Sequence, residues 1–198
     1  MTDLFEEPED ATPLAPDERE DLKQSWITHQ RDLNEAEQAN ILKGAAWVRR
    51  RRGRKVNDLL NDDFAILLHQ HMFGDVWKWA GAFRQTERNI GIAAYRISVE
   101  VRSMFDDICY WVEHKSYLPD EIAVRLHHRL VAIHPFPNGN GRHARLIADL
   151  LIEKLGGRHF SWGGGSLIDI GELRAKYVAA LQAADGHDIR PLLAFARS

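Results

Sequence analysis

A twelve-residue segment, His134-Pro-Phe-Pro-Asn-Gly-Asn-Gly-Arg-His-Ala-Arg145, contains the residue types that phosphate chemistry needs. His134 titrates near neutral pH and could take a proton from an attacking hydroxyl group. Gly139 and Gly141 let the backbone turn sharply and come close to a ligand. Arg142 and Arg145 are three residues apart, so on a helix both would share one face and bind phosphate oxygens. The segment therefore predicts a site that holds a polyphosphate and moves a proton beside it.

The backbone around this segment predicts an anion site that needs no side chain. Pro135 disfavours helical geometry at His134, so we expect a helix to end there. The next helix should begin near Asn140, and its first turn would present unpaired N–H groups and the positive end of the helix dipole. Such a helix start binds anions. The side-chain oxygen of Asn138 could hold Mg²⁺ against the phosphates.

Helices must position this loop, because helical periodicity dominates the chain. Asn57-Asp58 is expected to begin a helix that Gly74 ends. Residues 84–97 have no helical stripe; they combine turn residues with β-formers, which predicts a short hairpin. The fold class is all-α, a helical bundle with one short β-hairpin. Further helices are expected over residues 33–51, 98–115, 121–133, 144–155, 171–184 and 191–197.

Composition limits the class of protein. With 198 residues, 44% of them hydrophobic, the chain can bury one sizeable core. Residues 1–21 carry nine acidic side chains, which predicts a flexible tail. Cys109 is the single cysteine, so we expect no intrachain disulfide, no cysteine-based zinc site and a reducing compartment. The acidic N-terminus is not a signal peptide, and no apolar run is long enough for a bilayer. These features predict a cytoplasmic protein with no membrane partner.

Two other features, a basic run and a set of histidines, could indicate nucleic-acid binding and metal binding, but simpler roles are preferred for both. The basic run at residues 49–55 could bind nucleic acid, but the net charge of -3 does not suggest a dedicated nucleic-acid binder. A solvated helix end, favoured by the helix dipole, is more common, and the run could also dock the acidic tail or a partner. His127, His128 and His143 could join His134 as metal ligands. His127 and His128 are adjacent and so point to different helix faces, which favours capping or packing roles.

Residues 134–145 resemble the signature of the Fic/Doc family, His-Pro-Phe-x-x-Gly-Asn-Gly-Arg-x-x-Arg, over its whole length. The resemblance extends over residues 55–155. Trp79-Ala80-Gly81 followed by Arg84 resembles the family's approach to its flap hairpin, here residues 84–97. The segment from His127 to His134, with Asn89-Ile90-Gly91, is similar to the subgroup called mobile mystery protein B.

The resemblance implies a division of the chain into four parts. Residues 1–24 would be the acidic flexible tail, residues 25–54 a helical extension, residues 55–155 the Fic core and residues 156–198 a second helical extension.

The resemblance also implies an activity: transfer of AMP from ATP, with Mg²⁺ or alternatively Mn²⁺ as cofactor, to a Tyr, Thr or Ser hydroxyl of a target protein. His134 would be the general base and Phe136 would anchor the loop. The phosphates would be held by Gly139, Asn140, Gly141, Arg142 and Arg145. The flap would align the target's backbone by strand addition, through Arg84, Asn89, Ile90 and Gly91. Trp162 is a candidate wall of the adenine pocket.

One position departs from the family pattern. The family usually has Asp or Glu where this chain has Asn138, and Mg²⁺ prefers anionic oxygen, so metal affinity should be lower. Two alternatives therefore stay open. One is a Fic-fold transferase with another donor, such as UMP, phosphate or phosphocholine; the other is a non-catalytic nucleotide-binding or protein-binding module.

The inhibitory Ser/Thr-x-x-x-Glu-Gly/Asn helix of the family has no clean copy in this chain, and Glu35 and Glu37 are loose candidates. Both self-inhibition and inhibition by a separate antitoxin-like protein therefore stay open. In the second case the chain could be the toxin of a two-component module. A homo-oligomer also stays open.

Overall fold

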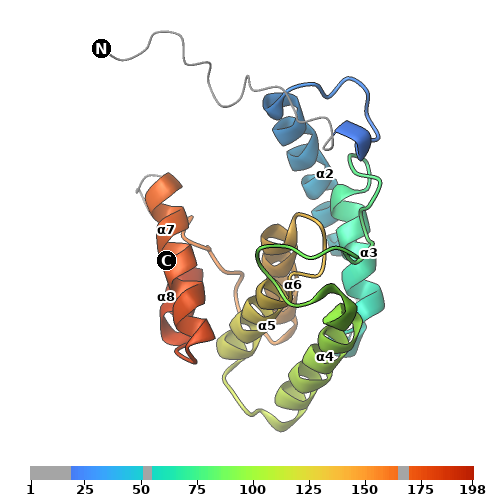
Figure 1. Cartoon of the computed structure of the whole chain (residues 1–198). Helices are drawn as coiled ribbons and strands as arrows, with labels where there is room; N and C mark the ends of the chain where they lie inside the picture. The colour runs from blue at the N-terminus through green and yellow to red at the C-terminus, as the bar shows by residue number, and fades with distance from the viewer. Residues whose placement is uncertain (1–18, 51–54, 165–169) are drawn as a thin grey trace, which may run out of the picture. The chain divides into compact units, whose positions relative to one another are not determined.

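A computed structural model of the chain describes residues 19–50, 55–164 and 170–198 (Figure 1). Some predictions fall wholly or partly outside these residues: most of the acidic tail, most of the basic run at residues 49–55, and the ends of the helix predicted over residues 33–51 and of the extension at residues 25–54.

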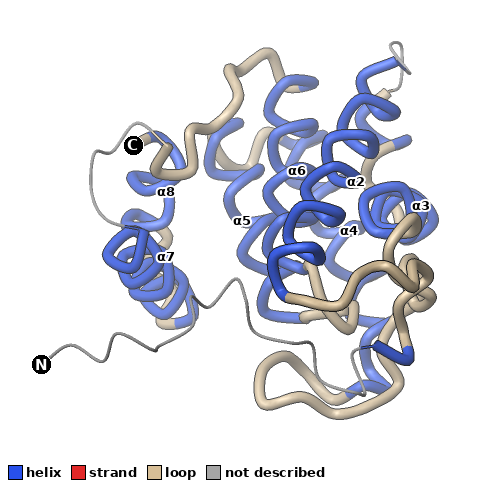
Figure 2. Tube along the Cα trace, turned by 90° about the horizontal axis from the view of Figure 1, so that it is seen from above, coloured by secondary structure: helices blue, strands red, loops and turns tan. Residues whose placement is uncertain are grey.

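The described residues form helices joined by loops, with no strand among them, as Figure 2 shows. A single isolated antiparallel bridge pairs Leu22 with Trp77. The all-α prediction is therefore confirmed. The helical elements are α2 (Gln30–Arg50), η2 (Val56–Asp58), α3 (Asp62–Phe73), η3 (Ala94–Arg96), α4 (Ile97–His114), α5 (Pro119–Ile133), α6 (Asn140–Lys154), α7 (Ile170–Asp185) and α8 (Arg190–Arg197).

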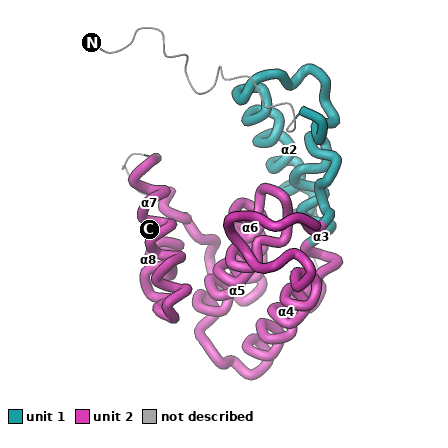
Figure 3. The backbone as a smooth tube through the Cα atoms, viewed as in Figure 1, with its two compact units in different colours: residues 1–52, 66–82 teal, residues 53–65, 83–198 magenta. Residues whose placement is uncertain are grey.

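The chain divides into two compact units (Figure 3). The first takes the chain up to residue 52 together with residues 66–82, and the second takes residues 53–65 and 83–198. All of the candidate site residues lie in the second unit. In the first unit, the indole of Trp77 donates to the buried carboxylate of Glu37 at 2.7 Å, which joins α2 to the turn after α3.

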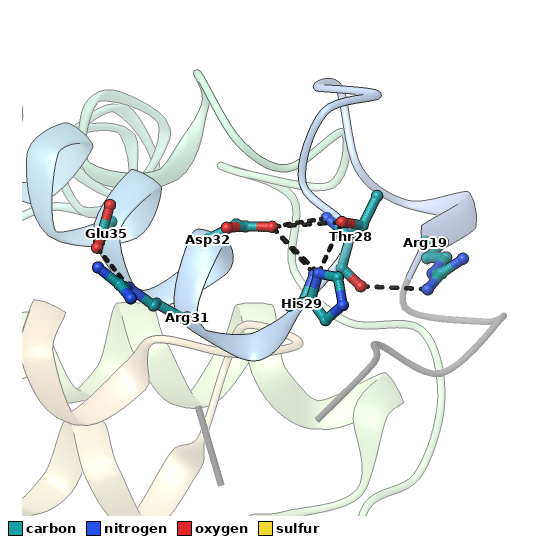
Figure 4. Close-up of polar contacts among 6 residues, drawn as sticks. All are labelled: Arg19, Thr28, His29, Arg31, Asp32 and Glu35. Atoms are coloured by element: carbon teal, nitrogen blue, oxygen red, sulfur yellow. Dashed lines mark hydrogen bonds and ion pairs between the residues drawn. The ribbon is translucent and has the colours of Figure 1, made fainter. Parts of the chain in front are cut away.

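A hydrogen-bond network around Asp32 joins the first turn of helix α2 to the residues just before it (Figure 4). Asp32 accepts hydrogen bonds from the N–H groups of Thr28 and His29, both at 3.2 Å. These bonds lower the pKa of Asp32. Arg31 and Glu35 pair on the exposed side of the same helix, so Glu35, a candidate for self-inhibition, has a partner on its own helix.

In the second unit, helix α5 packs against α4, α6 and α8 and forms the centre of the core. Helices α4 and α5 bury the apolar positions that the periodicity of the sequence predicts. On α4 the buried residues are Ile97, Val101, Met104, Phe105 and Ile108; on α5 they include Ile122, Leu126, Leu130 and Ile133. Within the described residues, no helix is both long and apolar enough to cross a bilayer.

The helix predicted to begin at Asn57-Asp58 begins later. Residues Val56–Asp58 form the short 3₁₀ helix η2, and α3 starts at Asp62. Asn61 explains this start, because its side-chain oxygen accepts the N–H of Phe64 at 2.8 Å and so caps the new helix. The helix ends at Phe73 before Gly74, as predicted.

Candidate active site

His134 terminates helix α5 in a left-handed backbone conformation, with a φ of 54°. Its N–H still donates to the carbonyl of Leu130 at 3.0 Å, and Pro135 prevents the helix from continuing. The predicted helix end is therefore confirmed. Burial lowers the pKa of His134, and the positive charge of Arg84 lowers it further. The neutral imidazole that results is the form that accepts a proton.

The turn after His134 is closed by a side chain that the sequence analysis assigned to phosphate. The Asn140 side chain accepts the N–H of Phe136 at 2.9 Å and donates to its carbonyl at 2.8 Å. The side-chain amide of Asn140 is therefore occupied by Phe136, and Asn140 can contact a ligand through its backbone. Phe136 is fully buried, against Phe83 and the edge of His143. These contacts fix the loop on the core.

Helix α6 begins at Asn140, as predicted, and no side chain caps it. Gly139 precedes it with a φ of 78°, a conformation that favours glycine. Gly141 is different: a Cβ placed there would meet nothing nearer than the hydroxyl of Tyr177, at 3.9 Å. Packing therefore does not require a glycine at position 141, and the space it leaves open is available to a phosphate beside the helix start.

A hollow of about 230 Å³ lies over this helix start. It brings together the predicted base, the candidate metal ligand, the glycine turn and both arginines. Its lining residues are His134, Asn138, Gly139, Asn140, Gly141, Arg142 and Arg145.

Arg145 is held by aromatic rings from outside the motif. Its guanidinium carbon lies 4.6 Å from the ring centroid of Tyr177 and 5.8 Å from that of Trp162. The Trp162 indole in turn donates to the carboxylate of Asp149, at 3.2 Å and 3.3 Å to its two oxygens. The Arg145 Nε is buried and has no hydrogen-bond partner among the described residues. The side chain is thus positioned by stacking and keeps donor capacity for a ligand.

A second hollow, of about 370 Å³, adjoins the first because Arg145 lines both. Its walls are mostly aromatic and aliphatic, contributed by the loop after α6 and by helices α7 and α8. They are Arg145, Trp162, Leu173, Arg174, Tyr177, Val178 and Phe195. The predicted wall residue Trp162 is therefore next to the phosphate hollow.

Tyr177 and His127 form a buried pair that the sequence analysis missed. The tyrosine hydroxyl and the His127 Nε2 are 3.0 Å apart. Burial lowers the pKa of His127 to about 3 and raises the pKa of Tyr177, so both are neutral. No local motif marks Tyr177, and the sequence predicts only that it lies on a helix over residues 171–184.

The flap prediction needs two corrections. Residues 84–97 contain no strand pair in the described structure, so the predicted hairpin is wrong. Residues 84–93 form a loop because the Arg84 side chain, not a partner strand, binds its carbonyls, including that of Thr86 at 2.9 Å. The rest of the segment is helical, as η3 and the first residue of α4. Arg84 is itself buried, with 2% of its surface exposed, so its side chain is not presented to a target. Asn89, Ile90 and Gly91 are exposed, and their role in target binding stays a prediction.

Asn138 is the weakest part of a metal site. Its side-chain oxygen accepts the N–H of Gly139 at 2.6 Å. It is a neutral oxygen, and the described residues contain no group of three or more His, Cys, Asp or Glu side chains that could hold a metal. A divalent cation would thus depend mainly on the oxygens of a bound polyphosphate, with Asn138 as the side-chain ligand the hollow offers.

The other motif-proximal histidines pack, as we preferred. His143 is buried, and its Nε2 lies 2.9 Å from the carbonyl of Ala65. Burial lowers the pKa of His143 to about 4. The Nε2 of His128 lies 2.7 Å from the Asp185 carboxylate, which joins α5 to α7.

The fold and the site define an all-α protein in which a helix start without a side-chain cap lies beside a neutral histidine. Residues 59–152 match the model of the Fic/DOC family. This part of the chain is therefore a Fic/DOC family domain, and it falls within the predicted core at residues 55–155. The boundaries of the other predicted segments stay predictions.

Individual proteins agree with this assignment. The chain is 31% identical over 145 residues to protein adenylyltransferase fic-1 of Caenorhabditis elegans, a match that covers 71% of this chain. It superimposes on the structure of Fic-1 (residues 134–508) from C. elegans with a TM-score of 0.61 and 25% identity, covering 81% of this chain and 48% of that one. BepC of Bartonella tribocorum, solved with bound AMPPNP, gives a TM-score of 0.65 at 18% identity, covering 90% and 95%. The chain spans only about a quarter of the curated relatives' length, 27% for the first of them.

Proposed function

We propose that this chain is a protein adenylyltransferase that transfers AMP from ATP to a Tyr, Thr or Ser hydroxyl of a target protein. The observation that carries the proposal is the pairing of a neutral, half-buried His134 with an uncapped helix start in one hollow. The names of the curated relatives, protein adenylyltransferases, support the same reaction.

In this reaction His134 accepts the proton of the target hydroxyl as the oxygen attacks the α-phosphorus of ATP. The bond from that phosphorus to the bridging oxygen breaks, and pyrophosphate leaves. The backbone of residues 139–141 and the guanidinium groups of Arg142 and Arg145 hold the phosphate oxygens, whose charge they stabilise. Catalysis is thus mostly positioning and charge stabilisation.

The second hollow is proposed to take the base. It shares Arg145 as a lining residue with the phosphate hollow, and the Trp162 and Tyr177 rings offer stacking surfaces. Mg²⁺, or alternatively Mn²⁺, would be held by Asn138 together with the phosphates, and would neutralise part of their charge.

Finer assignments are part of the same proposal. The similarity of Asn89-Ile90-Gly91 and of the residues from His127 to His134 to mobile mystery protein B supports that subgroup. A toxin role, controlled by a separate antitoxin-like protein, is supported by the lack of a clean inhibitory motif. In the first unit Glu37 is bound by Trp77, which argues against its acting as the inhibitory glutamate. A cytoplasmic location rests on Cys109 being the single cysteine.

One observation favours a second candidate, a non-catalytic nucleotide-binding module: Asn138 stands where the family usually has a carboxylate. A donor comparison separates the candidates. The full chain and its His134→Ala variant are incubated with a cell lysate and Mg²⁺ or Mn²⁺, using ATP labelled at the α-phosphate, ATP labelled at the γ-phosphate, labelled UTP or labelled CDP-choline. Label from α-labelled ATP alone, lost in the variant, supports adenylyl transfer. Label from another donor alone would replace it, and nucleotide binding without label from any donor would favour the module.

A further inference from the structure

Arg84 is a fully buried cation, with its side chain 1% exposed. Arginine is almost never buried to this extent unless its donors are satisfied. Within the part of the chain that the structure describes, Arg84 pairs with the carboxylate of Glu87, which lies 4.0 Å from Nη1 and is itself 68% exposed, so this ion pair is weak. The partners that stabilise Arg84 must therefore be found elsewhere.

Those partners are backbone carbonyls on two separate loops. On the motif side, the Nε donates to the carbonyl of His134 at 2.7 Å, and Nη2 lies 3.5 Å from that of Ile133. On the flap side, Nη1 donates to the carbonyl of Thr86 at 2.9 Å, and Nη2 donates to that of Ile92. One guanidinium group thus ties the flap segment to the end of helix α5.

The backbone reinforces the same junction. The N–H of Arg84 donates to the carbonyl of Pro135 at 2.9 Å, on the other side of His134. Gly91 lies so close that a Cβ there would stand 2.6 Å from the Cβ of His134 and 2.8 Å from the Arg84 Nη2. His134 is therefore held by contacts to its own carbonyl and to the carbonyl after it, and Gly91 leaves no room for a side chain beside its Cβ.

We propose that Arg84 is a positioning residue that joins the flap to the motif loop and orients His134 for proton transfer. The left-handed conformation at His134 is unfavourable for a residue with a Cβ. Arg84 holds that conformation by binding the carbonyls of Ile133 and His134 through its side chain and the carbonyl of Pro135 through its own N–H. The imidazole is then aimed into the phosphate hollow by its backbone.

A lysine could not replace this arrangement. The guanidinium fork sends donors in several fixed directions, whereas an ammonium group concentrates its three donors at one atom. Lysine would keep the positive charge beside His134 and lose most of the carbonyl contacts. Methionine would lose both. The two variants therefore separate orientation from charge.

The charged groups around His134 make this separation measurable. Arg84 and Arg88 lie on the flap side, Arg142 and Arg145 line the same hollow, and Glu87 is the acidic residue beside Arg84. Removing the Arg84 charge should favour the protonated imidazole of His134. In a plot of transfer rate against pH, the rise on the acidic side (the acidic limb) should therefore move to higher pH. Exchanging Arg84 for lysine should leave that limb in place.

The test compares Arg84→Lys, Arg84→Met and the exposed control Arg102→Lys in the full chain. Its kinetic arm rests on the proposed function. We expect Arg84→Lys to bind ATP normally and to transfer AMP about 100-fold more slowly, the loss typical of a small misplacement of a catalytic group. Arg84→Met should add the shift of the acidic limb, and Arg102→Lys should match the wild type. A folded Arg84→Lys variant with the wild-type rate would overturn the proposal.

A second arm needs no activity. The histidine ring signals of isotope-labelled, ligand-free protein are recorded by NMR, with His134 assigned from a His134→Gln variant. The His134 signal should move in both Arg84 variants, and its titration midpoint should rise in Arg84→Met. Unchanged His134 signals in folded variants would overturn the proposal even if the wild type proved inactive. If the Arg84 variants do not fold, Gly91→Ala tests the same junction with Arg84 kept; wild-type transfer and an unmoved His134 signal in that variant would count against it.

Discussion

The guanidinium carbon of Arg145 lies 4.6 Å from the ring centroid of Tyr177, so helix α7 holds an arginine of the motif on α6. Tyr177 lies outside residues 59–152, the part that matches the family model. The candidate site is therefore completed by the C-terminal helices of the second unit. These helices are predicted to be required for nucleotide binding as well as for stability.

Replacing Tyr177 by Leu should weaken ATP binding about tenfold, because the ring that positions Arg145 is lost. Tyr117→Leu is a matched control. The guanidinium carbon of Arg125 lies 4.4 Å from the ring centroid of Tyr117, which makes the same kind of contact. Tyr117 lies near the start of helix α5, whereas the candidate site lies at its end. Isothermal titration calorimetry should show a loss for Tyr177→Leu and none for Tyr117→Leu. Equal affinities for the two variants would contradict the positioning role of Tyr177.

Gly141→Ala should separate binding from stability. A Cβ at position 141 meets no protein atom closer than 3.9 Å, so the fold should keep its stability or gain up to about 1 kcal/mol from the better helix propensity of alanine. ATP affinity should nevertheless fall about tenfold or more, because the methyl group enters the phosphate space. Gly156→Ala is the converse control: its φ is +84°, so it should lose stability and keep ATP binding. Unchanged ATP affinity in Gly141→Ala would show that the phosphates lie elsewhere.

Much of the site could be predicted because it depends on local rules. Pro135 fixed the end of α5, and the glycine turn before Asn140 fixed the start of α6. The hairpin failed for a reason that local patterns do not reveal. Alternating β-formers predict a strand only if another strand supplies its hydrogen bonds, and here the Arg84 side chain supplies them. Tyr177 was missed because its role depends on tertiary contact across more than thirty residues of sequence.

The buried histidines predict acid sensitivity. His127 and His143 have pKa values of about 3 and about 4 in the folded protein, against 6.5 when exposed. In acid the unfolded chain therefore binds more protons than the folded protein does. The contribution of these two histidines to the free energy of unfolding is fully present above about pH 6.5 and is lost as the pH falls toward 4. His143→Gln keeps a donor for the carbonyl of Ala65 but does not titrate. Between pH 5 and 6 it should reduce the slope of unfolding free energy against pH by about 1.4 kcal/mol per pH unit. Urea unfolding at several pH values measures this slope, and a slope equal to the wild type's would contradict the assignment.

Asn138→Asp should strengthen metal binding, because a carboxylate replaces a neutral amide oxygen at the mouth of the phosphate hollow. We expect the transfer rate at limiting Mg²⁺ to rise and the Mg²⁺ concentration for half-maximal rate to fall, while the rate at saturating Mg²⁺ changes less. Asn34→Asp, on the exposed side of helix α2, adds the same charge outside the candidate site and controls for a general electrostatic effect. Identical Mg²⁺ dependence in Asn138→Asp and the wild type would refute the account of this position.

The central claim is that His134 acts as the base in adenylyl transfer, and peptide mass spectrometry tests it most directly. The wild type and the His134→Ala variant are each incubated with ATP, Mg²⁺ and a cell lysate, after ATP binding has been verified for both. The account predicts AMP esters on Tyr, Thr or Ser side chains with the wild type and none with the variant. No AMP ester from a wild type that binds ATP, or equal modification by the variant, would contradict it.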